Sequence, residues 1–259
     1  MSPTMIFVAI VTGLFLVMLA LMEIGRRTGV RRKRQDSKGA DAGLTTIDGA
    51  VFGLMGLLVA FTFSGAATRF DARRQLIGQE ANAIGTAYLR IDLLPAVAQP
   101  ALRDDFRNYV DARVGYYRNL ATDDREAQLA LDKSNALQGK IWSASIIACE
   151  KVTSPATTSL VLSSLNDMID ITTTRAVAAE THPPPVVFWG LGVLVLASAL
   201  LAGYGMAEAR TRSWLHMLIY SAILATAVYV IIDLEYPRLG LIRIDAADHV
   251  LTDLRSSMK

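Results

Sequence analysis

The stretch of sequence that decides the fold is GAVFGLMGLLVAFTFSGAATRFDARR, which occupies residues 49–74. Its first part, from Gly49 to Ala67, contains no charged side chain. A helix needs about 20 mostly apolar residues to cross a bilayer. Because the hydrocarbon offers backbone groups no hydrogen-bond partner, only a segment that satisfies these groups internally can cross it. Residues 49–67 are therefore expected to form a transmembrane helix.

Three further stretches have the same character, so the chain is expected to cross the membrane four times. They are Met5–Leu21, Val186–Met206 and Trp214–Ile232, which contain no Asp, Glu, Lys or Arg and only one histidine, His216. The first is not expected to be a cleaved signal peptide, because its basic residues follow the apolar run instead of preceding it. The composition is 52% hydrophobic and 19% charged, and strand signals are negligible. The sequence thus predicts an all-α integral membrane protein.

The second span is expected to continue beyond the membrane as one unbroken helix. No proline, which would interrupt a helix, occurs between Ile47 and Leu94. Beyond the membrane, apolar residues recur at intervals of seven, four, three, four and three, which is typical of a helix face packed against other helices. These residues are Phe70, Ile77, Ala81, Ile84, Tyr88 and Ile91. The second span is therefore expected to enter a helical bundle.

Helix-start signals predict three more helices before the third span. Pro100 suits the first turn of one helix, and Asp123 and Asp124 can cap the next. Thr153 or Ser154 can cap the third, with Pro155 in its first turn. The face expected to pack on the first of these helices consists of Leu102, Phe106, Tyr109, Arg113 and Tyr116. The proline run 183–185 is expected to end the last helix of the bundle.

The domain organisation follows from these elements. Residues 1–48 hold the first transmembrane helix and a basic loop, 49–67 the second transmembrane helix, 68–185 an extramembrane helical bundle, 186–233 the third and fourth transmembrane helices, and 234–259 a C-terminal tail. The tail is expected to include an amphipathic helix with Val250, Leu251 and Leu254.

The basic residues are distributed unevenly, which bears on orientation. The loops after the first and third spans carry Arg26, Arg27, Arg31, Arg32, Lys33, Arg34, Lys38, Arg210 and Arg212. Because short cytoplasmic loops are enriched in Lys and Arg, the bundle is expected on the extracytoplasmic side. Eight basic residues on the other side of the spans favour the opposite orientation, namely Arg69, Arg73, Arg74, Arg175, Arg238, Arg243, Arg255 and Lys259. The segment from Arg26 to Lys38 is also expected to contact anionic lipid headgroups, whereas a net charge of +2 gives no reason to expect nucleic-acid binding.

No catalytic or metal-binding pattern is found in the sequence. His182, His216 and His249 lie far apart and have no partners at ligand spacing. A phosphate-binding glycine loop and a nucleophile elbow are also missing. No span carries an ionisable residue at its centre, which argues against an ion-coupled transporter. We therefore expect no enzyme activity, catalytic residue, metal or cofactor, and we expect the single cysteine, Cys149, to be a packed helix residue.

The second span and its exit resemble the bestrophin family. In that family a pore-lining helix carries a phenylalanine eight residues before an arginine–aromatic pair, as Phe61, Arg69 and Phe70 do here. The wider chain is similar to a bacterial membrane family that has been called bestrophin-like. The further matching pieces are Gly53, Arg73, the basic first loop, residues 80–85, 88–90, 94–95 and 233–237, and Gly240.

This resemblance implies a pentameric ion channel in a bacterial inner (cytoplasmic) membrane. Bestrophins mostly conduct chloride, and some bacterial members pass cations. Their narrow neck, carried over by position, would be formed by Phe61, Leu57 and Gly53, and glycine at the last position implies a wider opening there. The acidic calcium clasp of animal bestrophins has no evident match. Bestrophins keep the large domain in the cytoplasm, which opposes the orientation expected from charge.

The side chains of the second span are also compatible with a pore, independently of the family. Positions 53, 57 and 61 share one helix face, so a symmetric ring of Phe61 and Leu57 would form an apolar constriction that gates by dewetting. Rings of Arg69 and Arg73 at the mouth would enrich anions. The alternative is that Phe61 packs among the spans of one chain and that Arg69 extends to the membrane interface.

Small residues in the second span indicate close helix contacts. Gly49, Gly53 and Gly56, with Gly65 further on, suit either packing within the chain or oligomerisation. Four helices of one chain enclose little space, so a pore requires a homo-oligomer. The rival hypothesis is a membrane sensor or accessory protein, although no output domain accompanies the spans. The sequence therefore predicts an oligomeric channel for an inorganic ion, with an anion favoured.

Overall fold

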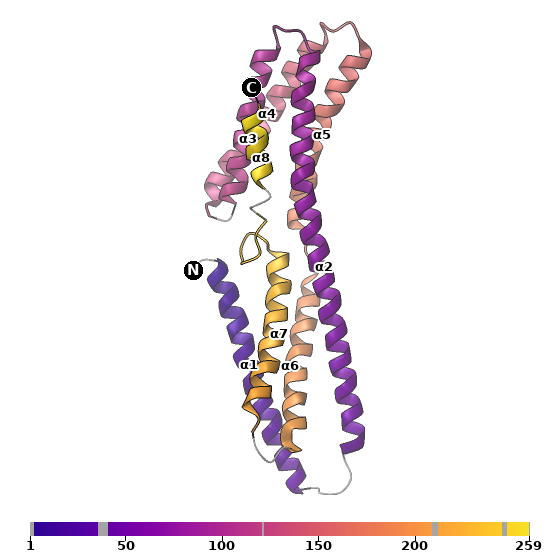
Figure 1. Cartoon of the computed structure of the whole chain (residues 1–259), viewed down its shortest axis with the longest axis vertical. Coiled ribbons are helices and arrows are strands. Elements are labelled where there is room, and N and C mark those ends of the chain that lie inside the picture. The colour runs from indigo at the N-terminus through magenta and orange to yellow at the C-terminus, as the bar shows by residue number, and fades with distance from the viewer. Residues whose placement is uncertain (1–2, 36–40, 121, 209–211, 245–247, 259) are drawn as a thin grey trace. The chain divides into compact units, whose positions relative to one another are not determined.

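The structure is a computed structural model that describes residues 3–35, 41–120, 122–208, 212–244 and 248–258. Figure 1 shows that these residues form helices and connecting loops, and no strand occurs among them. The elements are α1 (Pro3–Gln35), α2 (Asp41–Arg90), η1 (Ile91–Leu93), α3 (Gln99–Asn119), α4 (Asp124–Cys149), α5 (Pro155–Glu180), α6 (Pro185–Gly205), η2 (Met206–Glu208), α7 (Trp214–Glu235) and α8 (His249–Ser257). The predicted all-α class is confirmed for the described residues.

Four helical stretches in the described part of the chain are long and apolar enough to cross a membrane. They are Met5–Arg34, Thr46–Leu93, Pro155–Gly205 and Trp214–Glu235. Three of them contain a predicted span, and the third stretch ends one residue before the end of the predicted span Val186–Met206. The prediction of four apolar spans is therefore confirmed. Lys38 and Arg210 of the basic loops lie outside the described residues.

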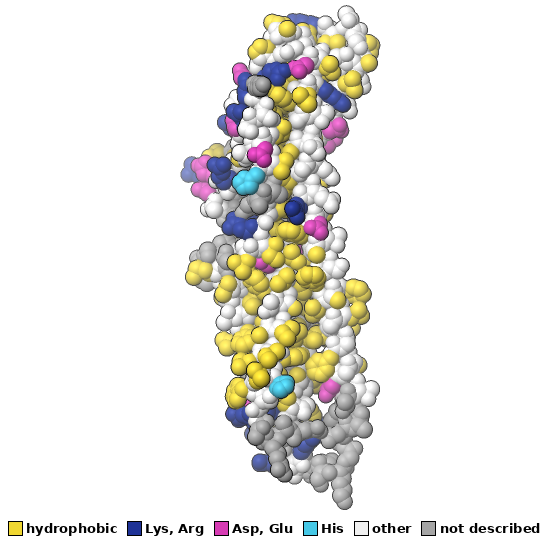
Figure 2. Space-filling model, viewed as in Figure 1, with side chains coloured by type: hydrophobic (Ala, Val, Ile, Leu, Met, Phe, Trp, Pro, Cys, Tyr) yellow, Lys and Arg dark blue, Asp and Glu magenta, His cyan; other side chains and the backbone are white. Residues whose placement is uncertain are grey.

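The chain divides into two compact units. Unit 1 consists of Met1–Thr68 and His182–Leu241, and unit 2 consists of Arg69–Thr181 and Ile242–Lys259. The division falls within α2, so one helix contributes its first part to unit 1 and its second part to unit 2. On the face shown in Figure 2, hydrophobic side chains gather over the helices of unit 1, and charged side chains of both signs gather over unit 2.

In unit 1, α1 and α6 pack with their backbones in close contact. A Cβ atom on Gly203 would overlap the backbone of Met22, and one on Gly25 would overlap the backbone carbonyl of Leu200. Small residues permit such close approach between membrane helices, where packing replaces the hydrophobic effect as the source of stability. Met18 and Met22 of α1 and Leu191, Val195 and Ala199 of α6 are buried.

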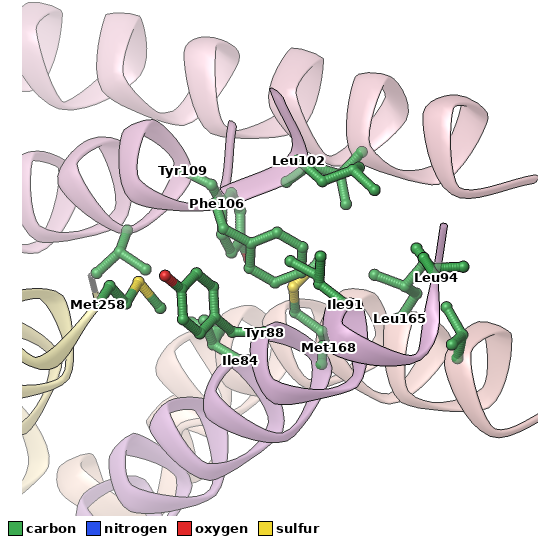
Figure 3. Packing of buried hydrophobic residues seen from close by; sticks show 14 of the residues in the cluster. Ile84, Tyr88, Ile91, Leu94, Leu102, Phe106, Tyr109, Leu165, Met168 and Met258 are labelled. Atoms are coloured by element: carbon green, nitrogen blue, oxygen red, sulfur yellow. The ribbon is translucent and has the colours of Figure 1, made fainter. Parts of the chain in front are cut away.

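Unit 2 contains a continuous hydrophobic core, drawn in Figure 3. The predicted face of α2 contributes Ile77, Ala81, Ile84, Tyr88 and Ile91, all of which are buried, whereas Phe70 is half-buried. The rings of Tyr88 and Phe106 meet edge to face with their centroids 5.8 Å apart. The core is completed by α3, α4, α5, α8 and Met258 directly after α8. The helices contribute Leu102, Tyr109, Ile141, Cys149, Leu165, Met168 and Leu251.

The predicted helix boundaries in unit 2 are largely confirmed. Asp123 caps α4, because its side chain accepts hydrogen bonds from the backbone N–H groups of Arg125 and Glu126 at 3.0 and 3.1 Å. Ser154 caps α5 by accepting from the N–H of Thr157 at 3.3 Å. On α3, four of the five residues expected to pack are buried, and Tyr117 is buried in place of the partly exposed Tyr116.

Candidate functional site

The predicted neck residues lie on the face of α2 that points away from the other helices of unit 1. Leu57 is 51% exposed and Phe61 is 66% exposed. Gly53 is exposed as well, and a Cβ atom placed there would meet nothing within 4 Å. The structure therefore excludes the alternative that Phe61 packs among the spans of its own chain.

The opposite face of α2 holds the helix to unit 1. Met55, Thr62 and Ala66 are buried there, and the rings of Phe52 and Tyr220 of α7 meet edge to face at 6.4 Å. The hydroxyl of Thr62 donates to the carbonyl of Leu58 at 2.7 Å, which satisfies this polar group within the helix. One side of α2 is thus occupied by its own chain, while bulky apolar side chains on the other side are left for lipid or another subunit.

The two predicted mouth arginines have different surroundings from the neck residues. Arg73 is 8% exposed, and its guanidinium donates to the carbonyls of Ala178 and Thr181 at 2.9 and 2.8 Å. These carbonyls belong to the C-terminal end of α5, where a cation is favourable. Arg69 is half-buried. On an α-helix, Arg69 and Arg73 lie about 120° and 160° around the axis from Leu57, on the packed side.

Three of the four predicted packing glycines of α2 make no close contact within the described part of the chain. At Gly49, Gly53 and Gly56 a Cβ atom would meet nothing within 4 Å, and Gly65 is half-buried. The close helix contacts within unit 1 instead use Gly25 and Gly203, as described above. Packing of the α2 glycines against another subunit stays a prediction.

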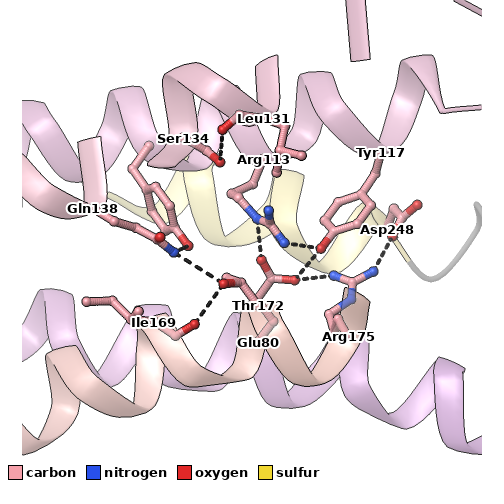
Figure 4. Close-up of polar contacts among 11 residues, drawn as sticks. Glu80, Arg113, Tyr117, Leu131, Ser134, Gln138, Ile169, Thr172, Arg175 and Asp248 are labelled. Carbon is pink, nitrogen blue, oxygen red and sulfur yellow. Dashed lines mark hydrogen bonds and ion pairs between the residues drawn. The ribbon is translucent and has the colours of Figure 1, made fainter. Parts of the chain in front are cut away.

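A buried ionic cluster in unit 2, shown in Figure 4, was not predicted from the sequence. Glu80 of α2 has no exposed surface, and its Oε1 accepts from Nε of Arg113 at 2.7 Å. Its Oε2 accepts from the guanidinium of Arg175 and from the hydroxyl of Tyr117, the latter at 2.9 Å. Asp248, just before α8, pairs with Arg175 at 3.5 Å. One carboxylate therefore ties α2 to α3 and α5, and Arg175 extends the cluster to the C-terminal tail.

The electrostatics keep this cluster charged at neutral pH. Burial raises the pKa of Glu80, but the positive charges of Arg113 and Arg175 outweigh it and hold the pKa below its ordinary value. Burial also raises the pKa of Tyr117 well above its ordinary value, and it raises the pKa of Tyr109 to about 12. The sequence signal was a glutamate inside the apolar face of α2 together with Arg113 on the packed face of α3.

A second polar cluster lies at the end of α7 in unit 1. Asp233 and Glu235 are 1% and 0% exposed. Asp233 accepts from the backbone N–H of Leu241 at 3.1 Å, and His182 lies 3.1 Å from Glu235 and stacks on Tyr236. Among the residues that the structure describes, no three His, Cys, Asp or Glu side chains come together as metal ligands. Asp233 therefore holds the turn after α7 through the backbone of Leu241, and Glu235 and Tyr236 hold the end of α7 against His182.

The fold defines a class of membrane protein with four spans, in which the second membrane helix continues into a helical bundle. The family model of the Bestrophin-like domain matches residues 12–248, so the chain belongs to the Bestrophin-like family. The resemblance seen in the sequence is thereby confirmed. No curated protein matches the chain.

Solved structures of a bacterial bestrophin homolog from Klebsiella pneumoniae have a similar fold. A variant with a leucine-to-threonine mutation has a TM-score of 0.73 and 15% identity, with 96% of this chain and 98% of that chain covered. A variant with an isoleucine-to-threonine mutation gives 0.70 at 15% identity, with 95% and 99% covered. The structure phased with zinc gives 0.65 at 14% identity, with 95% and 98% covered. At such identities the likeness shows a shared fold.

Proposed function

We propose that the chain is one subunit of an oligomeric ion channel whose neck is formed by α2. The observation that carries this proposal is the exposure of Leu57 and Phe61 on the face opposite to the one that packs on unit 1. Copies related by a rotation axis, with this face toward the axis, would place these side chains in stacked rings. We propose a homo-oligomer in the bacterial cytoplasmic membrane, and the bestrophin resemblance favours a pentamer.

The chemistry of the rings suits a gate. Apolar constrictions hold back ions by excluding water, so they conduct only when they widen or become wetted. Phe61 supplies the bulkiest ring, Leu57 the next one, and Gly53 leaves that end of the neck wide. Lipid would cover the apolar faces of α1, α6 and α7, where Val186, Trp189 and Leu215 are 71%, 75% and 65% exposed.

The anion selectivity predicted from the sequence has less support than the neck. It depends on positive charge at the mouth from Arg69 and Arg73, and Arg73 is buried against the carbonyl end of α5. A ring of positive charge near the axis would therefore depend on Arg69. Conduction of chloride remains a prediction, separate from the proposal that the protein is a channel.

Two phenylalanines of α2 provide a matched test. Phe61 and Phe63 both belong to the membrane part of α2, and Phe63 is 46% exposed. The two side chains point about 160° apart around the helix axis. In planar bilayers containing purified oligomer, we expect unitary currents, with a larger leak from Phe61→Ala and an unchanged current from Phe63→Ala. Equal effects of the two variants would show that Phe61 does not form the neck. Silent bilayers with demonstrably oligomeric protein would refute the channel and leave a sensor or accessory role.

A further inference from the structure

The outward face of α2 continues past the neck with polar residues. After Leu57 and Phe61, the same face carries Ser64, Thr68, Asp71, Gln75 and Asn82, and each of them is exposed. The intervals are four, three, four, three, four and seven residues, which keep a single line of side chains along one helix. We call these seven residues the outward line. Asp71 is its only charged member.

Asp71 has no neutralising partner among the described residues. No hydrogen bond or ion pair joins its carboxylate to any residue that the structure describes. Arg74, one turn further on, is exposed, and no ion pair links it to Asp71 within the described part of the chain. Arg73 is directed to the carbonyls of Ala178 and Thr181 on the opposite side of α2. The negative charge therefore stands alone on the outward line.

We infer that Asp71 determines the ion selectivity of the channel by forming a ring of carboxylates that concentrates inorganic cations. The inference rests on the proposed function, because the ring exists only if the outward line faces the axis of an oligomer. Asp71 is ten residues beyond Phe61, or about 15 Å along the helix. Rings of Asp or Glu at such positions select cations, since a lining of one sign raises the local concentration of the opposite ion.

The neighbouring residues of the outward line suit the same ion. The hydroxyls of Ser64 and Thr68 and the amides of Gln75 and Asn82 present oxygen atoms, which are favourable partners for hard cations. The arginines that favour an anion lie on the packed side of the helix. The structure thus shifts the expected permeant ion from chloride to a small inorganic cation such as potassium or sodium.

Reversal potentials under a potassium chloride gradient test the inference on purified oligomer in planar bilayers. We expect the wild-type protein to favour K⁺ over Cl⁻, and Asp71→Asn to lower this permeability ratio about tenfold. A matched control is Asp167→Asn, which removes an exposed carboxylate from α5 and should leave the ratio unchanged. Arg69→Gln should not lower the ratio.

The outcomes separate the inference from the channel proposal. Currents that favour chloride in the wild type, or a ratio that Asp71→Asn does not change, would overturn the role of Asp71 while leaving a channel. A fall in the ratio with Asp167→Asn as large as that with Asp71→Asn would show only an effect of net charge and would also overturn it. No current from oligomeric wild-type protein would remove both. An unchanged elution volume of Asp71→Asn in size-exclusion chromatography confirms that this surface substitution leaves the assembly intact.

Discussion

Glu80 holds a negative charge in the interior of unit 2, where an isolated carboxylate would be very costly to bury. The cost is offset because Arg113, Arg175 and Tyr117 all donate to its two oxygens. The sequence indicates that Glu80 and Arg113 lie on packed helix faces, since helical spacing assigns a residue to a face. Spacing does not tell which residues of different helices meet, and for that reason this cluster could not be predicted.

Replacing Glu80 by glutamine should strongly destabilise unit 2. The substitution leaves two buried guanidinium groups against a neutral amide, and breaking a buried ion pair from one side costs about 3–5 kcal/mol. Thermal or denaturant unfolding of the purified protein in detergent measures this loss. Glu150→Gln, which changes an exposed glutamate at the end of α4, is the control and should change stability little.

The pH dependence of this stability has a defined sign. Because the pKa of Glu80 is lowered in the folded protein, its contribution is complete above the ordinary glutamate pKa and is lost as pH falls through the lower, folded value. The wild type should therefore lose stability below about pH 4 more steeply than Glu80→Gln. Parallel stability curves for the two proteins, or an equal loss in Glu150→Gln, would contradict the assigned role.

At the scale of elements, the course of α2 could be predicted better than its surroundings. The lack of proline after Ile47 predicted one long helix, and α2 indeed runs from Asp41 to Arg90. In unit 2 the packed face of α2 was also predictable, because a helix beside water carries polar residues on its outer face and apolar residues on its packed face. Within the membrane the packed and outward faces are both apolar, since lipid is as apolar as a helix interface. The exposure of Leu57 and Phe61 in the single chain therefore could not be predicted from hydrophobicity.

The contact of α1 with α6 gives a test at the same scale. Gly203→Ala places a methyl group into the backbone of Met22, so the helices must separate, and overpacking of this kind costs about 1–3 kcal/mol. Gly192→Ala, also on α6, is the matched control because a Cβ atom there meets nothing within 4 Å. Thermal stability in detergent should fall for Gly203→Ala alone. A similar fall in both variants would mean that the close contact is not formed.

At the scale of the whole molecule, the side of the membrane that holds unit 2 is a separate question from the fold. The basic loop after the first span favours an extracytoplasmic bundle, and the bestrophin resemblance favours the cytoplasm. In either orientation, the predicted domain organisation places the bundle on one side of the membrane. The predicted domains are residues 1–48, 49–67, 68–185, 186–233 and 234–259. A topology measurement distinguishes the two orientations.

Cysteine labelling provides this measurement. Asp124 is exposed in the first turn of α4 and, unlike the capping residue Asp123, can be replaced without loss of a helix cap. In a Cys149→Ala background, we expect Asp124→Cys to react with a membrane-impermeant thiol reagent on intact cells, as the positive-inside rule predicts. Labelling only after the cells are permeabilised would show that the bundle is cytoplasmic.

The proposed channel requires that the outward line of α2 face the axis of a closed oligomer. An experimental structure of the purified oligomer, determined by cryo-electron microscopy, tests this most directly. We predict a ring, with five subunits favoured, in which Leu57 and Phe61 narrow the path on the axis and Asp71 faces the same path beyond them. A structure in which another helix lies nearest the axis, or in which lipid covers Phe61, would contradict the proposed neck.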